Sequence, residues 1–224
     1  MTTIEQLRGE HGFTLIELMV ASVCTVIVLG SAVALTSQIQ SGYRRQIEDS
    51  VAEQEARYAL DWIGRYLRSA GNNPLNAPPS PCSAVDPDFQ AIIPDPDGNT
   101  VHNDITLMSD NNPPDKNIGG ANTAQVPCNQ ANEHVTIRFN SGTNSIEFRD
   151  NGVGATAATT RTDSVIQNLQ FTYLDSNRAP WNGVSAANIF YVRTIITVRT
   201  RTMNASTGQP TTRTMMSEIR VRGR

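Results

Sequence analysis

The hydrophobic and polar pattern of the chain begins with a long apolar run near the amino terminus. The run covers residues 13–35 and contains one charged side chain, that of Glu17. A helix of this length rises about 34 Å at about 1.5 Å per residue, which exceeds a hydrocarbon core of about 30 Å. The pattern therefore predicts a helix that spans a membrane.

A helical pattern continues beyond this run. Residues 38–70 contain no proline, and apolar side chains recur there at spacings typical of one helix face. These positions are Ile47, Val51, Ala59, Ile63, Tyr66 and Ala70. We expect this half of the helix to be amphipathic and to pack on a globular domain through a face that has three aromatic residues near it. These aromatic residues are Tyr58, Trp62 and Tyr66.

The helical pattern stops at a clear signal. Gly71 favours a left-handed helix cap, and Pro74 prevents a further turn. The residues that follow read NNPLNAPPSPCSAVDPDF, a composition rich in Pro, Asn and Ser that does not continue a helix. We therefore expect one helix over residues 13–70, followed by a loop-rich region.

Short runs of alternating apolar and polar residues indicate strands after the helix. The apolar positions of the shorter runs are Ile105, Leu107, Val135, Ile137, Phe139, Ile146, Phe148, Val165, Leu169, Phe171 and Tyr173. Two longer runs flank the turn MNASTGQP and place Val192, Ile196, Val198, Met215, Ile219 and Val221 on one face. Their other face carries Arg193, Thr197, Arg199, Arg201, Glu218, Arg220 and Arg222. An antiparallel sheet with one face in solvent, packed on the helix, is predicted, and the fold class is α+β.

Charge is unevenly distributed over a composition that is ordinary for a folded protein. The net charge is −3, but acidic residues outnumber basic ones 10 to 3 in residues 72–160, whereas basic residues prevail 9 to 3 in residues 161–224. Phosphate or DNA contact is one interpretation of the basic strand face, with Arg199, Arg201, Arg220 and Arg222 as its candidates. A solvated strand face, or a contact with the acidic segment, is the other. The runs lack interleaved aromatic residues for base stacking, so we do not expect a nucleic-acid partner.

Two ordinary explanations compete for the apolar run. A secretory signal peptide has a positive start and an apolar region of 7–15 residues, whereas this run is longer and its leader sets Arg8 against Glu5 and Glu10. A plain membrane anchor needs no carboxylate, which costs about 2.5–3.5 kcal/mol at the centre of a membrane. Glu17 lies near the start of the run, where the cost is lower, yet it still calls for a partner.

The start of the apolar run reads GFTLIELMVA. It resembles the processing motif of type IV prepilins and type II secretion pseudopilins, in which a short charged leader ends in glycine and a glutamate is the fifth residue of the cut chain. The resemblance implies that a prepilin peptidase cleaves between Gly12 and Phe13 on the cytoplasmic side. It also implies that the amino group of Phe13 is then methylated and that Glu17 is retained for assembly.

Cleavage at this site gives a physical reason for the carboxylate. It creates a cationic amine at Phe13 within apolar surroundings, and Glu17 of a neighbouring subunit is suited to pair with it. An unpaired buried charge is strongly destabilising, so such a pair favours one register between subunits. The alternative is that Glu17 is only a processing determinant or extends to the membrane interface.

The second half of the predicted helix carries a further resemblance. Its sequence EARYALDWIGRYLRSAG is similar to the segment after the membrane helix in minor pilins of the PilW type and, less closely, in the secretion pseudopilin labelled J. This implies a minor pilin that takes part in priming and assembly of a type IV pilus. The implied partners are other minor and major pilins, the prepilin peptidase and the inner-membrane assembly platform.

The resemblance also implies a domain order and a location. Residues 1–12 form the leader, residues 13–70 the long helix, and residues 71–224 a globular domain in the periplasm of a bacterium, later on the pilus. Two other functions stay open: a pseudopilin of a type II secretion system, and an adhesive or DNA-binding subunit at the tip of the filament.

The three cysteines have different surroundings in the sequence. Cys24 lies in the apolar run, whereas Cys82 and Cys128 lie in the loop-rich region. A disulfide between the latter two suits an oxidising compartment and would add about 4 kcal/mol on the loop-entropy model. Two free thiols are the alternative.

Enzymatic motifs are not found. The three histidines, His11, His102 and His134, form no zinc or triad pattern, and there is no phosphate-binding glycine loop or paired CxxC. We expect no catalytic activity and no cofactor. His134 alternates with apolar neighbours and is expected on the outward face of a strand.

One acidic segment resembles a metal-binding loop. Asp95, Asp97 and Asn99 occupy alternate positions in DPDGNTVHND, as in calcium loops, and Asp104 is nearby. The glycine falls at the fourth position rather than the sixth, and the closing glutamate is absent. A turn built on Pro-Asp-Gly explains the same residues without an ion, and we prefer it.

Overall fold

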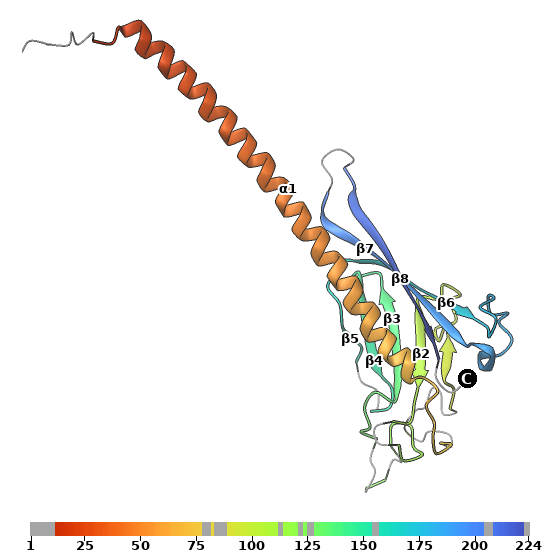
Figure 1. The fold of residues 1–224 in the computed structure, drawn as a ribbon. Coiled ribbons are helices and arrows are strands. Elements are labelled where there is room, and N and C mark those ends of the chain that lie inside the picture. Colours follow the sequence, from red (N-terminus) through yellow and green to blue (C-terminus); the bar gives the residue numbers. More distant parts are fainter. Residues whose placement is uncertain are drawn as a thin grey trace, which may run out of the picture. The chain divides into compact units, whose positions relative to one another are not determined.

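The computed structural model describes residues 12–77, 82, 89–111, 114–120, 123–124, 128–153, 157–203 and 208–221, without the side chains of Arg201 and Thr202. The chain divides into two compact units, Met1–Ile47 and Glu48–Arg224. One α-helix, α1 (Leu15–Ser69), begins in the first unit and ends in the second (Figure 1). The predicted long amino-terminal helix is therefore confirmed.

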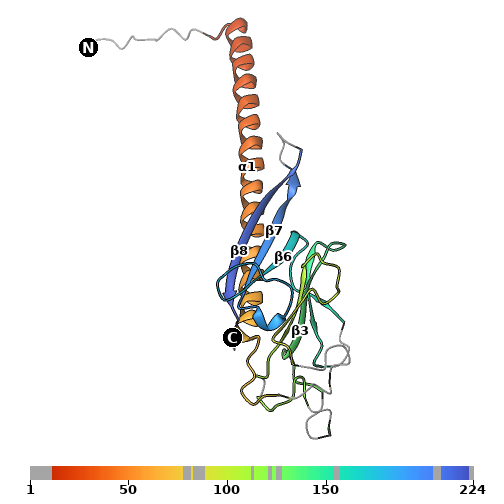
Figure 2. The same cartoon turned by 90° about the vertical axis from the view of Figure 1, so that its right-hand side faces the viewer.

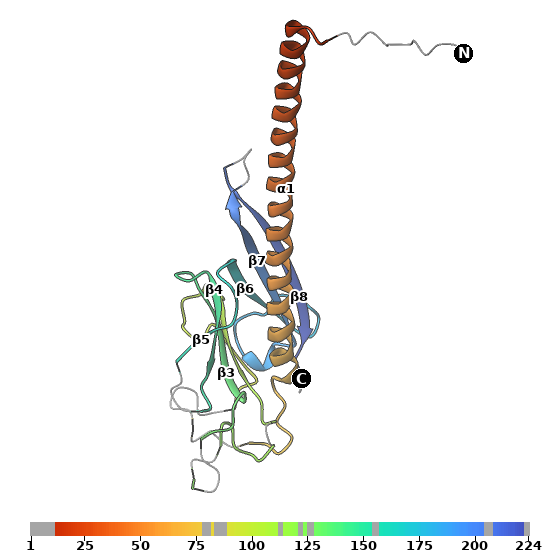
Figure 3. The same ribbon diagram turned by 90° about the vertical axis from the view of Figure 1, so that its left-hand side faces the viewer.

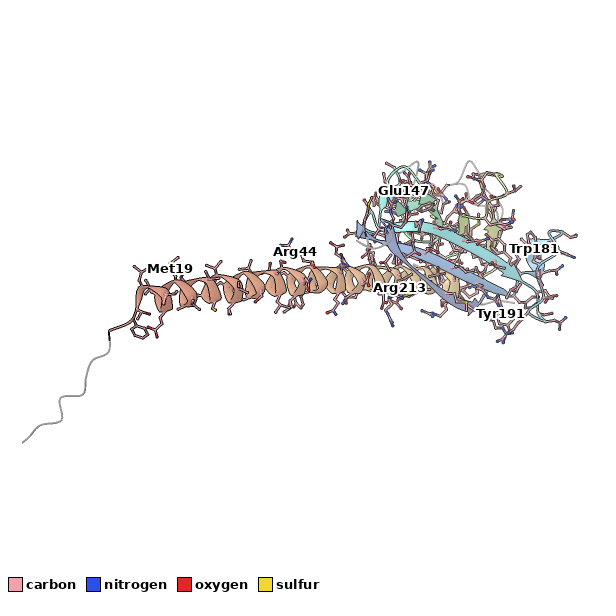
Figure 4. All side chains as sticks on the ribbon, turned by 90° about the horizontal axis from the view of Figure 1, so that it is seen from above. Met19, Arg44, Glu147, Trp181, Tyr191 and Arg213 are labelled. Atoms are coloured by element: carbon pink, nitrogen blue, oxygen red, sulfur yellow. A yellow bond between two sulfur atoms is a disulfide. The ribbon has the colours of Figure 1, made fainter. Side chains whose placement is uncertain are left out.

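The first unit consists of the apolar half of α1 and the few residues before it. Every described residue up to Ser41 is exposed, although most are apolar. The side chains of Met19 and Arg44 project from the helix surface in Figure 4. Within this half, the helix has the length and composition of a membrane span.

Helix α1 ends as the sequence predicts. Gly71 adopts the left-handed conformation, with φ of 80°. Its N–H donates to the carbonyl of Met108 at 2.9 Å, and the N–H of Asn72 donates to the carbonyl of Ser69 at 3.0 Å. The cap therefore ties the end of the helix to the second strand of the domain.

In the second unit, α1 buries a face dominated by small residues. Its buried positions are Ala52, Ala56, Ala59, Trp62, Ile63, Gly64 and Leu67. The expected face was partly wrong, because Ile47 and Val51 are each 46% exposed. Alanine allows the helix axis to come closer to the strands than isoleucine or valine does, and this explains the shift of the buried face.

The strands of the second unit form two antiparallel sheets. The first has the order β1-β2-β3-β4-β5. Its strands are β1 (Ile92–Pro94), β2 (Asp104–Met108), β3 (His134–Asn140), β4 (Ser145–Asp150) and β5 (Thr159–Thr160). The sequence indicated β2, β3 and β4, whereas β1 and β5 are too short to give an alternating pattern.

The second sheet has the order β6-β7-β8 and contains the two longest strands. Its members are β6 (Ile166–Leu174), β7 (Tyr191–Met203) and β8 (Pro210–Arg220), with a short 3₁₀ helix, Ala186–Asn188, before β7. The register of β6 on β7 shifts between Ile166 and Asn168, at the single polar interruption of its pattern. A β-bulge explains that interruption, since the extra residue restores the inward direction of the side chains after it.

Both sheets contribute to one hydrophobic core with the second half of α1. Figures 2 and 3 show β8 beside this half of the helix, and β6 lies next to the sheet that contains β3. Trp62 and Tyr66 of the helix contact the ring of Phe148 on β4, with ring centroids 6.4 and 5.3 Å away. The confirmed α+β fold is thus held together by apolar and aromatic contacts of one helix face.

The expectation for His134 was wrong. This residue begins β3 and is fully buried rather than outward-facing. The loop after β2 covers this end of the strand, because the neighbouring Glu133 accepts N–H groups from Asn111 and Gly119 at 3.1 and 2.9 Å. Alternation within a strand did not reveal this, since the covering segment comes from another part of the chain.

Candidate processing and assembly site

The residues that begin the helix are open to solvent. Gly12 is exposed, and a β-carbon placed on it would meet nothing within 4 Å. Phe13 is 89% exposed, and both residues lie before the first turn of α1. The peptide bond between them is therefore not protected by helix hydrogen bonds, as a cleavage site requires. Residues 1–11 of the expected leader lie outside the described residues.

Glu17 has a local partner that the sequence interpretation missed. Its Oε2 accepts both the backbone N–H and the hydroxyl of Thr14, each at 2.9 Å. In return, the backbone N–H of Glu17 donates to Oγ1 of Thr14 at 3.3 Å. This reciprocal arrangement is a capping box, and the Thr-x-x-Glu spacing is its sequence signal. Glu17 thus stabilises the start of the helix as well as being a candidate for assembly.

The serine and threonine hydroxyls in the exposed half of α1 are satisfied within the helix. Each donates to a backbone carbonyl three or four residues earlier, at 2.7–2.8 Å. The residues are Ser22, Thr25, Ser31, Thr36, Ser37 and Ser41. Such bonds remove the cost of placing a hydroxyl in hydrocarbon, where no water is present to replace them.

The surface of this half is therefore suited to apolar surroundings. Its large side chains from Phe13 to Leu35 are 58–89% exposed in the single chain. A contiguous apolar surface of this extent marks contact with lipid or with other proteins. Glu17 is the only charge on that segment. The arrangement supports a membrane anchor whose helix also offers a packing surface.

The expected disulfide is present in the second unit. Cys82 and Cys128 are joined, with their Cα atoms 5.5 Å apart. Cys24 is a free cysteine, exposed on the apolar half of α1. The bond joins the segment after α1 to the segment before β3, and it suits an oxidising compartment.

The candidate arginines are not brought together as one patch. In the ladder of β7 and β8, Arg199 pairs with Thr212 and Arg220 pairs with Tyr191. The two arginines are thus eight positions apart, or about 27 Å at about 3.4 Å per residue. Arg222 and the side chain of Arg201 lie outside the described residues. The two described candidates for DNA contact therefore lie far apart along the ladder, and the expectation of no nucleic-acid partner stays a prediction.

Other arginines in or beside this sheet have acidic partners within the chain. Arg193 and Arg178 both contact Glu218, at 2.8 and 3.4 Å. Arg213 lies near Asp49 and Glu53 of α1, at 4.0 and 3.9 Å, and Figure 4 shows its side chain beside the helix. These contacts favour an intramolecular role for part of the basic strand face.

The acidic loop brings together a set of residues different from the expected one. One carboxylate oxygen each from Asp95, Asp97 and Asp104 lies within 4.8 Å of the others. Asn99 instead closes a turn, because its Oδ1 accepts the N–H of Val101 at 2.7 Å. Burial, followed by the negative charges of Asp97 and Asp95, raises the pKa of Asp104 to about 6.

Comparison with known proteins identifies one feature of the chain. Residues 7–33 match the family model described as the prokaryotic N-terminal methylation motif. This match covers Gly12, Phe13 and Glu17, and it supports a type IV pilin or pseudopilin family. No curated protein and no solved structure matches the chain significantly.

Proposed function

We propose that this protein is a minor pilin that takes part in priming and assembly of a type IV pilus. One observation carries the proposal: an exposed apolar helix begins directly after Gly12 and Phe13, and Glu17 is the only charge on its first 23 residues. The helix passes through the inner membrane, and the second unit lies in the periplasm before it joins the pilus. Prepilin peptidase removes the leader and methylates Phe13.

Assembly depends on a charge pair in this proposal. The cationic amine of Phe13 in one subunit pairs with Glu17 of the next, within a bundle of apolar helices. Breaking a buried pair costs about 3–5 kcal/mol, because the remaining charge has no partner. The capping box is consistent with this role of Glu17. It holds the carboxylate of Glu17 at the end of the helix where the amine is created.

The size of the second unit supports a minor rather than a bulk subunit. It extends from Glu48 to Arg224 and has two sheets and a disulfide-linked loop region. A unit with such long loops would crowd a uniform filament. We therefore propose a role in which few copies interact with other minor pilins, the major pilin and the assembly platform at the membrane.

Mass spectrometry of the membrane-extracted protein tests the processing step. We expect a chain that begins at Phe13 and carries one added methyl group. A chain that keeps residues 1–12, or one that begins near Leu35 as after signal-peptide cleavage, would contradict the proposal.

Two substitutions of one residue separate the charge of Glu17 from its capping role. Glu17→Gln keeps a side chain that completes a capping box but removes the charge, whereas Glu17→Ala removes both. We expect both variants to be cleaved and inserted, and both to enter pili at least about tenfold less than the wild type. Normal incorporation of Glu17→Gln beside failure of Glu17→Ala would show that capping alone explains the residue.

Deletion of the gene separates the two machines that use this motif. We expect the deletion to reduce the number of pili and to leave protein secretion unchanged. The opposite result would assign the chain to a type II secretion pseudopilus, which uses the same membrane helix for another assembly.

A further inference from the structure

Three carboxylates converge where the loop after β1 meets the start of β2. We propose that Asp95, Asp97 and Asp104 bind a calcium ion. The site belongs to the second unit, and its existence does not depend on the function proposed above. It goes beyond the loop motif of the sequence, because Asp104 takes the place of Asn99 as the third candidate ligand.

The strongest observation is a buried carboxylate oxygen without a partner. Asp104 is only 3% exposed, and its Oδ1 has no hydrogen-bond partner in the described part of the chain. The Oδ1 of Asp95 is likewise buried and without a partner there. Buried polar atoms are normally satisfied, and a buried anionic oxygen is among the most costly to leave alone. Two such atoms beside a third carboxylate indicate that a positive charge completes the site.

The nearest arginine in the ladder does not supply that charge. Arg138 lies opposite Asp104 in the pairing of β2 and β3. Its guanidinium instead contacts Glu147, with Nε–Oε2 and Nη2–Oε2 distances of 2.8 and 2.7 Å. Among the described residues, no ion pair joins Asp95, Asp97 or Asp104 to a basic side chain.

The geometry and the ligand chemistry fit calcium. The three oxygens lie within 4.8 Å of one another, so a single ion can lie at most about 2.8 Å from each of them, close to the usual calcium–oxygen distance of about 2.3–2.6 Å. All three ligands are carboxylates, which favour hard cations over zinc or copper. Calcium also accepts irregular sets of six to eight oxygens, whereas magnesium requires a near-ideal octahedron at about 2.0–2.1 Å.

Water has access to the remaining coordination positions. A hollow of about 310 Å³ borders Asp97 and Asp104, and its polar lining includes Asn99 and Asn103. Arg138 also lines it, with its guanidinium held by Glu147. A second hollow, of about 180 Å³, meets the same two aspartates from the side of Thr106 and Thr136. The protein therefore supplies three carboxylates, and water completes the coordination.

A turn without an ion explains only part of this arrangement. Oδ1 of Asp97 accepts the N–H of Asn99 at 3.0 Å, and Oδ2 of Asp95 accepts the N–H of Thr100 at 2.7 Å, as in ordinary turns. A backbone hydrogen bond from Asp97 also reaches the carboxylate of Asp104. The turn still leaves Oδ1 of Asp104 buried without a partner among the described residues, in a carboxylate that has an oxygen within 4.8 Å of those of Asp95 and Asp97. Protonation of Asp104 is the remaining competitor, and it predicts the opposite response to a change from aspartate to asparagine.

The test uses the full chain in detergent, with its disulfide intact, after treatment with a chelator. Calcium binding is measured by isothermal titration, and the midpoint of thermal unfolding, Tm, is measured with calcium, with magnesium and with chelator. Extracellular calcium sites have dissociation constants of about 0.1–1 mM, so 10 mM calcium is expected to raise Tm by roughly 3–10 °C. Magnesium at the same concentration is expected to give less than half of this rise.

Variants locate the effect. Asp104→Asn and Asp97→Asn are each expected to weaken calcium binding at least tenfold and to abolish the Tm rise. Asp97 is exposed, so its variant keeps the test valid if Asp104→Asn does not fold. The matched control is Asp61→Asn, an exposed helix residue that pairs with Arg65, and it should leave calcium binding unchanged.

Three outcomes would overturn the proposal. One is no heat of binding and no Tm rise with calcium in the wild type. Another is a higher Tm for Asp104→Asn than for the wild type in both chelator and calcium, as a shared proton predicts. The last is an equal Tm rise with magnesium, which would leave a general divalent site instead of a calcium site.

Discussion

The two halves of α1 have the same backbone conformation and opposite surfaces. In the first half, large apolar side chains such as Leu29 are exposed, at 60% in this case. In the second half, Leu67 is fully buried and the face it shares is rich in alanine. The apolar surface of the first half is therefore left to be covered by lipid or other proteins. That of the second half is covered by the two sheets.

The two regions also differ in how well their polar groups are hydrogen-bonded. The serine and threonine hydroxyls of the first half bond to their own helix, and Glu17 is satisfied by Thr14. The second unit, in contrast, buries polar groups that lack partners among the described residues, including both ring nitrogens of His134 and Oδ1 of Asp104. Local satisfaction suits a helix whose exposed surface lies in apolar surroundings, where no water replaces the missing bonds. In the second unit, buried polar atoms of this kind need a partner from outside the described residues or carry a cost in stability.

The largest expected effect tests the contrast between the two halves directly. Leu67→Ala should lower the free energy of unfolding of the second unit by about 2–5 kcal/mol, because it removes buried methyl groups and leaves a cavity. Leu29→Ala should change it by less than about 0.5 kcal/mol, since that side chain makes no contact in the core. Denaturant unfolding in detergent, followed by the fluorescence of Trp62 and Trp181, measures both.

An equal loss in the free energy of unfolding from Leu67→Ala and Leu29→Ala would contradict the contrast between the two halves of α1. It would show that the first half of α1 also contributes to the stability of the second unit. The wild type in a second detergent is the control, because it separates an effect of the micelle on Leu29 from an effect within the protein.

The next effect concerns a buried polar group of the second unit. Burial lowers the pKa of His134 to about 4, from a value near 6.5 in the unfolded chain. Above pH 6.5 neither state binds a proton at this residue, so its contribution does not vary with pH. Between pH 6.5 and 4 only the unfolded state binds one, and the free energy of unfolding falls by up to about 3 kcal/mol. Below pH 4 both states are protonated and the loss levels off.

The difference in stability between the wild type and a variant without the imidazole isolates the contribution of His134. The raised pKa of Asp104 acts in the opposite direction, because it adds stability as the pH falls through about 6. We therefore compare the wild type with His134→Met, in denaturant titrations from pH 7.5 to pH 4. The stability of His134→Met relative to the wild type should increase steadily below pH 6.5. A constant difference would contradict the account of the buried neutral imidazole.

The sequence was most informative where the structure is local. The helix and its end at Gly71 follow from periodicity and from the preference of glycine for a left-handed cap. The capping box of Thr14 and Glu17 is equally local, and its spacing was visible in the sequence although the interpretation did not use it. Alternation also predicted β7 and β8, because one of their faces is buried and the other is not.

Features that depend on distant contacts were not predictable in this way. Periodicity cannot tell whether Ile47 and Val51 or the nearby alanines meet the sheets, since that choice depends on how closely the strands approach. The burial of His134 depends on a loop from another part of the chain. Likewise, only the pairing of β1 with β2 places Asp104 beside Asp95.

The smallest effect compares two glycines of α1. A β-carbon at Gly64 would lie 2.7 Å from Cδ1 of Ile219 on β8, whereas one at Gly42 would meet nothing within 4 Å. Both positions are helical, so alanine should add up to about 1 kcal/mol of helix stability at either one. At Gly64 the displacement of Ile219 should outweigh this gain, and Gly64→Ala should lower the free energy of unfolding by about 1–2 kcal/mol. Gly42→Ala should instead slow amide hydrogen exchange around residue 42 without changing the unfolding of the second unit. A Gly64→Ala variant as stable as the wild type would show that Ile219 adopts another rotamer at little cost, and that the second half of α1 is less tightly packed on β8 than its buried alanines indicate.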